Sequence, residues 1–229
     1  MSDRDWERLG AATGVISVLL FIIGFGILPT PPDVDAPATE IHAYYTDEQG
    51  GIQASMALLT AALFFFIWFL GSLRSALRVA EGGTGRVSAI AFAGGLVSAG
   101  ALFTLITLFA GAAFRPEETT PEVTTAINDL AVVSGGPALA GLTALFAASA
   151  KVALRHRAFS TSIGLLLLLA ALAQPFAVGA MLTDSGVFAG DGVLGLFLPV
   201  AAFAIAILAT SGALVQRAGS SAVPRSGPQ

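Results

Sequence analysis

The chain has 229 residues, of which 55% are hydrophobic and only 11% are charged. Soluble domains carry about 25% charged residues, so this composition excludes an ordinary soluble domain. The net charge is −4 and there is no cysteine, which excludes disulfides, thiol chemistry and cysteine-ligated metal sites.

Six long segments contain no charged residue. They cover residues 9–32, 49–73, 87–114, 130–150, 158–183 and 192–216. A helix needs about 20 mostly apolar residues to cross a bilayer, and every segment is long enough. The predicted fold class is therefore all-α, a polytopic membrane protein with six transmembrane helices. We place the spans at about 9–28, 52–72, 87–113, 130–151, 160–182 and 191–216, in one membrane domain of residues 1–217.

The first span is expected to remain in the protein, because its apolar core is longer than the 7–15 residues of a signal peptide. The longest loop, 29–51, follows it. Ile41, Tyr44 and Tyr45 recur there at helical spacing, which predicts a short interfacial helix. Span 2 is predicted to continue past the membrane through residues 72–78.

Span 4 has a clear start signal, with Thr120 as N-cap and Pro121 at the first helical position. Two sides then separate, an apolar stripe (Val123, Ala126, Ile127, Leu130 and Val133) and a polar side (Thr124, Thr125, Asn128 and Asp129). We expect an amphipathic segment at the outer surface, broken or kinked at 134–137. A straight helix over 121–157 would be about 55 Å long, against a hydrocarbon core of about 30 Å. Part of it must lie outside the membrane.

The remaining segments are simpler. Spans 5 and 6 are joined by a short acidic loop, and the polar tail of residues 218–229 is predicted to be disordered and cytoplasmic.

The heptapeptides at 72–78 and 149–155 match at four of seven positions. The three hairpins are either related repeats or share only a topology and an Ala/Leu-rich composition.

Charge predicts the orientation. Ten of the eleven Lys and Arg residues fall on one side of the six spans, and Arg115 is the exception. Because Lys and Arg collect in cytoplasmic segments, both termini are predicted to be cytoplasmic, in the plasma (inner) membrane of a bacterium. Trp68 then lies at the inner interface, while Tyr44 and Tyr45 lie at the outer one.

Candidate site residues are few, because the central parts of the spans contain no ionisable group. Asn128 and Asp129 precede the expected break in span 4, and Gln174 lies beside Pro175 in span 5. Prolines free backbone carbonyls that neighbours or water must satisfy. The three side chains are candidates for an outward-facing polar pocket among spans 4–6. The alternative is a solvated helix start and ordinary proline kinks. No catalytic, cofactor or metal residue is assigned, and His42 is expected to be a surface histidine.

Small residues recur four apart on several spans, a spacing that lets helices approach closely. The pairs are Gly10 with Gly14, Gly94 with Ser98 and Gly136 with Ala140. They serve either packing within the bundle or self-association. The expected partners are the lipid bilayer and another membrane protein or a second copy; we expect no nucleic acid and no cofactor.

YYTDEQGG followed by FFFIWFLGSLR resembles a group of small six-span bacterial membrane proteins, frequent in actinobacteria, whose function is unassigned. The resemblance covers roughly residues 40–78 and supplies no catalytic residues. The leading hypothesis is a non-enzymatic interaction or accessory protein. The alternative is a small permease or channel that uses the pocket among spans 4–6, and the third is an enzyme that uses the outer acidic loops.

Overall fold

The computed structural model describes residues 3–33, 35–181, 187 and 193–220. Within them the chain is helical and has no strand. The α-helices are α1 (Asp3–Ile27), α2 (Ala38–Asp47), α3 (Gln49–Glu81), α4 (Arg86–Ala112), α5 (Pro121–Ser134), α6 (Gly136–His156), α7 (Thr161–Ala173) and α8 (Leu198–Ser220). Three shorter elements complete the chain: the 3₁₀ turns η1 (Pro116–Glu118) and η2 (Gln174–Met181), and the π-helical η3 (Val193–Phe197).

Six segments of the described chain are long and apolar enough to cross a membrane. They are Arg8–Ile27, Gln49–Glu81, Arg86–Ala112, Pro121–His156, Thr161–Val178 and Val193–Ala218. They correspond one to one with the predicted spans, so the all-α polytopic class is confirmed. The predicted end of span 5 at 182, the start of span 6 at 191 and the tail beyond 220 lie outside the described residues. The tail was predicted to begin at 218, but α8 continues to Ser220.

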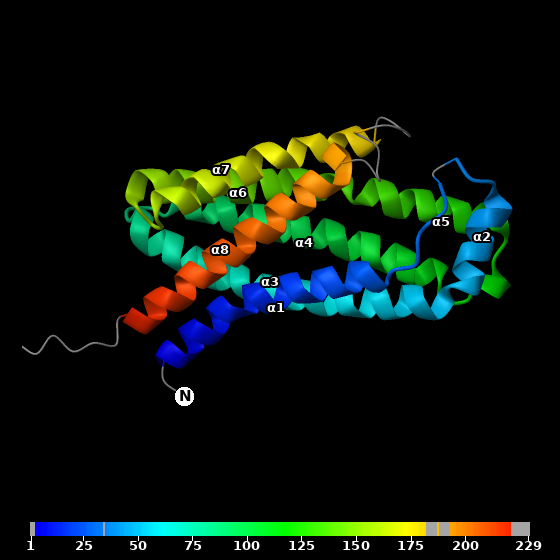
Figure 1. Cartoon of the computed structure of the whole chain (residues 1–229), viewed down its shortest axis with the longest axis horizontal. Coiled ribbons are helices and arrows are strands. Elements are labelled where there is room, and N and C mark those ends of the chain that lie inside the picture. Colours follow the sequence, from blue (N-terminus) through cyan, green and yellow to red (C-terminus); the bar gives the residue numbers. More distant parts are fainter. Residues whose placement is uncertain (1–2, 34, 182–186, 188–192, 221–229) are drawn as a thin grey trace, which may run out of the picture.

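The spans form a closed ring in chain order. α1 packs on α3, α3 on α4, α4 on α6, α6 on α7 and α7 on α8, and α8 returns to α1. The start of α1, the end of α8 and the α3–α4 and α6–α7 connections lie together at the left of Figure 1, whereas α2 and the start of α5 lie at the right. We call the first the basic end, because Arg78, Arg86, Arg155 and Arg217 lie there.

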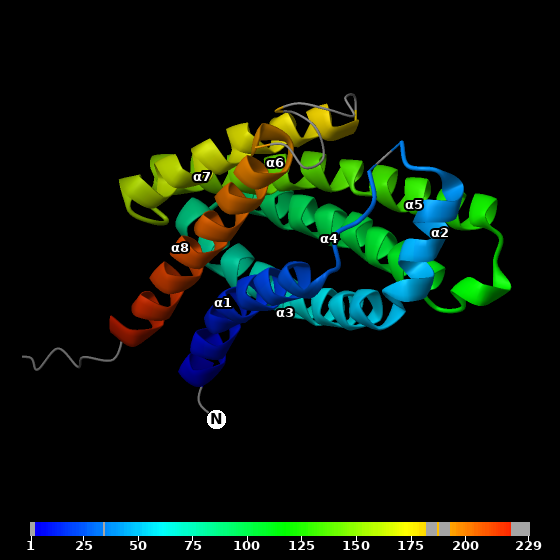
Figure 2. The same ribbon diagram turned by 45° about the vertical axis from the view of Figure 1, so that its right-hand side comes forward.

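The opposite end extends beyond the other spans. α3 has 33 residues and α5 with α6 covers 36, so each is about 50 Å long at 1.5 Å per residue and exceeds the roughly 30 Å hydrocarbon core. In Figures 1 and 2 the outer parts of α3, α4 and α5 project past α1, α7 and α8, and α2 lies across them. We call this projecting part, formed by α2, η1, α5 and the adjoining ends of α3 and α4, the cap.

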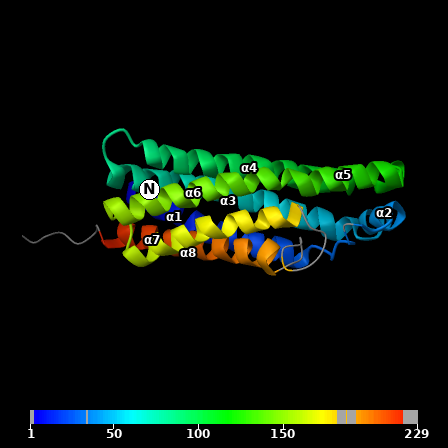
Figure 3. The same cartoon turned by 90° about the horizontal axis from the view of Figure 1, so that it is seen from above.

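The break predicted in span 4 is a local interruption. α5 ends at Ser134 and α6 begins at Gly136, while the intervening Gly135 keeps helical angles of φ −69° and ψ −25°. The two helices therefore continue in nearly the same direction, as Figure 3 shows. In span 5 the α-helix ends at Ala173 and a 3₁₀ turn follows, because Pro175 has no N–H for the α-helical ladder.

Close contact between helices depends on the small residues noted in the sequence. A Cβ added to Gly94 would lie 2.6 Å from the carbonyl oxygen of Gly141 on α6, so two glycines let α4 and α6 touch through their backbones. Ser98, one turn after Gly94, donates to the carbonyl of Ala138 at 2.8 Å. On α1, a Cβ at Gly14 would lie 2.6 Å from the Phe69 ring. Both motifs thus lie at contacts inside the bundle, while Ala140 is exposed.

The outward-facing side chains of the spans are apolar. Leu169 and Leu172 of α7 are 63% and 59% exposed, although side chains of this type are normally buried. Several hydroxyls in the spans are turned inward: Ser17 donates to Ala62 O at 2.9 Å, and Ser55 donates to Gly24 O at 2.8 Å. This surface suits lipid as its solvent, because these hydroxyls are satisfied by backbone carbonyls and need no water.

Candidate functional site

The cap is held together by the helix predicted in the first loop. α2 begins after Pro37, and its spaced residues Ile41, Tyr44 and Tyr45 are buried against the neighbouring elements. α2 packs mainly on α5, with further contacts to α3 and η1. The predicted helix is confirmed, but its apolar face covers protein and not lipid. The two tyrosines therefore lie inside the cap, where we had expected them to anchor a bilayer interface.

Side-chain hydrogen bonds join α2 to α5. The Tyr45 hydroxyl donates to Asn128 Oδ1 at 2.9 Å, and His42 Nδ1 lies 3.0 Å from Thr124 Oγ1. Tyr44 donates to the carbonyl of Pro29 at 3.0 Å, which fixes the end of the segment leaving α1. Two glutamines of α3 bond to the residue that follows α4: Gln49 and Gln53 donate to Ala113 O at 3.0 and 2.9 Å. Each element of the cap is thus bonded to a neighbour.

Burial changes the acidity of both tyrosines. Desolvation, with a smaller contribution from the Glu48 carboxylate, raises the pKa of Tyr44 to about 12. Desolvation and the neighbouring Tyr44 raise the pKa of Tyr45 further. Both effects disfavour the phenolate, since a buried charge loses its hydration. The hydroxyls therefore remain donors at physiological pH, as the bonds to Asn128 and Pro29 require.

α5 turns inward most of the side that the sequence marked as polar. Thr124 is buried and Asn128 is bonded to α2, whereas Val123, Leu130 and Val133 are exposed. Asp129 is exposed as well. The apolar stripe thus faces mostly away from the protein, although Ile127 packs against the core. Such an arrangement is typical of a helix whose outer side is next to lipid or a partner.

The three pocket candidates lie in two separate places. Asn128 belongs to the α2–α5 contact, with Asp129 next to it on the exposed side. Gln174 is 1% exposed, and its amide donates at 3.3 Å to Ala170 O and to Pro199 O of α8. Gln174 therefore joins the end of α7 to the start of α8. A pocket shared by all three side chains remains a prediction.

The centre of the ring is filled by aromatic rings. Phe203 of α8 lies 5.8 Å from Phe21 of α1, 5.6 Å from Phe66 of α3 and 6.2 Å from Phe146 of α6, measured between ring centroids. Four helices thus meet at one aromatic cluster. Aromatic pairs at these separations are in direct contact, so the cluster packs these four helices against one another.

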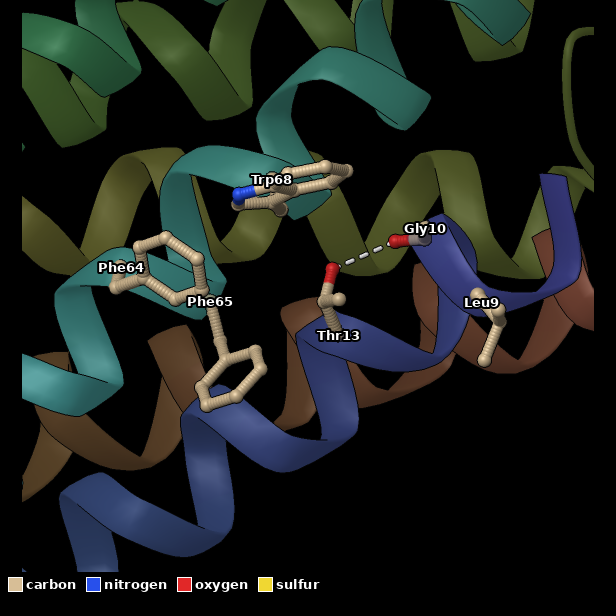
Figure 4. A pocket seen from close by; sticks show the side chains of 6 residues that line it. All are labelled: Leu9, Gly10, Thr13, Phe64, Phe65 and Trp68. Atoms are coloured by element: carbon tan, nitrogen blue, oxygen red, sulfur yellow. Dashed lines mark hydrogen bonds between the residues drawn. The ribbon is translucent and has the colours of Figure 1, made fainter. Parts of the chain in front are cut away.

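Two cavities open on the sides of the bundle. The first, about 200 Å³, lies between α1 and α3 and is lined by Leu9, Gly10, Thr13, Phe64, Phe65 and Trp68 (Figure 4). Thr13 donates to Gly10 O of its own helix at 2.6 Å, so this groove is apolar. The second, about 400 Å³, lies at the basic end and is lined by Phe159, Ser160, Ile163, Ala213, Gln216 and Arg217. We call it the α7–α8 cavity.

In the described part of the chain, no three His, Asp or Glu side chains gather closely enough to hold a metal ion. Sequence reasoning missed the Tyr45–Asn128 bond, which joins residues 83 positions apart. The available signal was a tyrosine on the apolar face of one short helix and an asparagine on the polar face of another. Only their pairing in space connects them.

The fold and its spans define a six-helix, multi-pass membrane protein. Comparison adds no relative: no family model matches the chain, and neither does any curated protein or any solved structure.

Proposed function

We propose that the protein is a non-enzymatic interaction or accessory subunit of a bacterial plasma membrane, and that it binds another protein through its cap. The basic end then faces the cytoplasm, in agreement with the preference of Lys and Arg for that side. This orientation places the cap outside.

The proposal depends on a contrast between two parts of the molecule. Aromatic side chains fill the centre of the ring, whereas side-chain hydrogen bonds hold the cap in a defined shape. The phenylalanine cluster around Phe203 occupies the middle of the ring. In the spans, serine hydroxyls and the Gln174 amide bond to backbone carbonyls. These polar groups hold helices together. The projecting end, by contrast, is an ordered surface outside the expected hydrocarbon region.

The cap surface has a distinct character. Its exposed carboxylates include Glu40, Asp47, Glu117, Glu122 and Asp129. Beside them stands the apolar stripe of α5. A mixed acidic and apolar surface on a preformed framework can bind a protein without ordering a loop first, which lowers the entropic cost of association.

The alternative, a small permease or channel, would need an aqueous route past the phenylalanine cluster or beside Gln174. A Gln174→Cys variant tests this, because the chain has no other cysteine. We expect no reaction with a membrane-impermeant thiol reagent in intact cells. Labelling would favour the permease.

Affinity purification in mild detergent tests the proposed role. We expect a protein to co-purify in stoichiometric amount with the wild-type chain. The double variant Glu122→Lys, Asp129→Lys reverses two exposed charges on α5 and should lose it. Arg86→Glu makes a charge reversal at the exposed start of α4, at the opposite end, and should keep it. A lone wild-type monomer, or loss of the partner only with Arg86→Glu, would contradict the proposal.

A further inference from the structure

The α7–α8 cavity has the lining of a lipid site. Phe159 just before α7, Ile163 at the start of α7 and Ala213 from α8 supply apolar surface, while Ser160, Gln216 and Arg217 supply polar groups. A cavity that changes from polar to apolar over one helical turn matches a phospholipid at the point where its phosphate joins the acyl chains.

The Arg217 side chain contacts the Phe159 ring in the wall of the cavity. Its guanidinium carbon lies 5.0 Å from the centroid of the Phe159 ring, and that ring is only 4% exposed. A ring contact uses the flat face of the guanidinium, whereas its N–H donors lie in the plane and match the oxygens of a phosphate. The side chain itself is exposed. Stacking thus orients the group without enclosing it.

The depth of Arg217 is that of a headgroup. Phe197 lies twenty residues earlier on the same span. Twenty helical residues rise about 30 Å, which is the thickness of the hydrocarbon core. The stretch between them exposes apolar side chains such as Ile205 and Leu208. Arg217 therefore lies where the apolar surface ends.

The charge of this end favours an anion. Its basic residues include Arg74, Arg78, Arg86, Lys151, Arg155, Arg157 and Arg217. Among the described side chains the acid at this end is Glu81, whose carboxylate accepts from the backbone N–H groups of Val87 and Ser88, each at 2.8 Å. A positive surface at the inner leaflet attracts anionic lipid by about 1 kcal/mol for each Lys or Arg near it.

We propose that the α7–α8 cavity binds one anionic phospholipid, with Arg217 as the ligand of its phosphate and with Ile163 and Ala213 against the upper part of the acyl chains. The apolar half of the lining assigns the site to a lipid and not to free phosphate. This inference is independent of the proposed interaction role, because it concerns the opposite end of the molecule.

Native mass spectrometry of the full chain in detergent, titrated with dioleoyl phosphatidylglycerol or dioleoyl phosphatidylcholine, tests the site. For the wild type we expect phosphatidylglycerol to bind about tenfold tighter, the ratio given by about 1.4 kcal/mol. Arg217→Gln should reduce the preference to near unity. Ala213→Trp fills the cavity without changing charge and should also abolish tight binding. Arg115→Gln, which removes a positive charge from the cap, is the matched control and should bind like the wild type.

Other outcomes would overturn the assignment. Equal affinity for the two lipids, or unchanged binding by both Arg217→Gln and Ala213→Trp, would remove the site. Displacement of the lipid by millimolar inorganic phosphate would identify the ligand as free phosphate. If Arg217→Gln fails to fold, as judged by size-exclusion chromatography, Ala213→Trp and the phosphate competition decide the question.

Discussion

The cap and the membrane-spanning ring use polar groups in opposite ways. In the cap, side chains bond across elements to other side chains, as Tyr45 does to Asn128 and His42 does to Thr124. In the ring, short hydroxyls bond to backbone carbonyls, as Ser98 does to Ala138. The difference follows from the solvent, because lipid offers no partner for a polar group that misses its bond. A short hydroxyl next to a carbonyl is a safe donor there, and the longer Gln174 side chain of the ring also bonds to backbone carbonyls.

Backbone contact in the ring should be its most sensitive feature. Gly94→Leu places a side chain against Gly141 O and Leu145 N, at 2.6 and 2.8 Å from the Cβ, and neither backbone atom can move aside. We expect a loss of about 3 kcal/mol or more in stability, the upper range for overpacking, measured by thermal unfolding in detergent. Gly100→Ala on the same helix meets nothing within 4 Å. It should be neutral or stabilise by up to about 1 kcal/mol through helix propensity. Equal losses in both variants would show that α4 and α6 are not in backbone contact.

Alkaline pH should open the cap and leave the ring intact. The two tyrosines of the chain are both in α2, so tyrosinate absorbance reports the cap alone. In an open cap both would ionise near pH 10, whereas in the closed cap Tyr44 has a pKa of about 12. A raised pKa stabilises the closed form fully below pH 10, and this stabilisation is lost as pH rises from 10 toward 12. We expect delayed, cooperative ionisation. Simple titration of both groups at pH 10 would mean that α2 is not docked.

The smallest effect should come from single hydroxyls in the ring. Ser98→Ala removes the bond to Ala138 O and should cost about 0.6 kcal/mol, the average for hydrogen bonds between membrane helices. Ser149 is the matched control, since its hydroxyl is buried on α6 without a hydrogen-bond partner in the described structure. Ser149→Ala should be neutral or stabilising, because it removes an unsatisfied polar atom. A larger loss for Ser149→Ala than for Ser98→Ala would reverse this assignment of roles.

Much of the fold could be predicted because membrane helices are defined locally. Uncharged segments of the right length marked the six spans, and Thr120 with Pro121 marked the start of α5. The spacing of Ile41, Tyr44 and Tyr45 identified α2, but the surface that this face covers could not be read from it. An apolar stripe fits a lipid surface and a protein surface equally well, and only the position of α5 decides between them.

The candidate site was harder to predict from the sequence for the same reason. Asn128 was a candidate because it precedes the expected break in span 4 and Gln174 because it lies beside Pro175, and each is bonded to a different helix. The phenylalanines around Phe203 look in the sequence like any other lipid-facing residues. Their meeting at the centre depends on how α8 lies against α1, α3 and α6.

Length, apolarity and charge, summed along single segments, were sufficient to determine that this chain crosses a membrane six times, since the transfer of each helix into lipid depends on its own residues alone. Which polar atoms meet, whether the ring is filled and where a lipid phosphate would lie were decided only by the tertiary structure. Those features depend on distances between residues that the chain separates by up to 200 positions, as in the bond from Ser211 to Ala11.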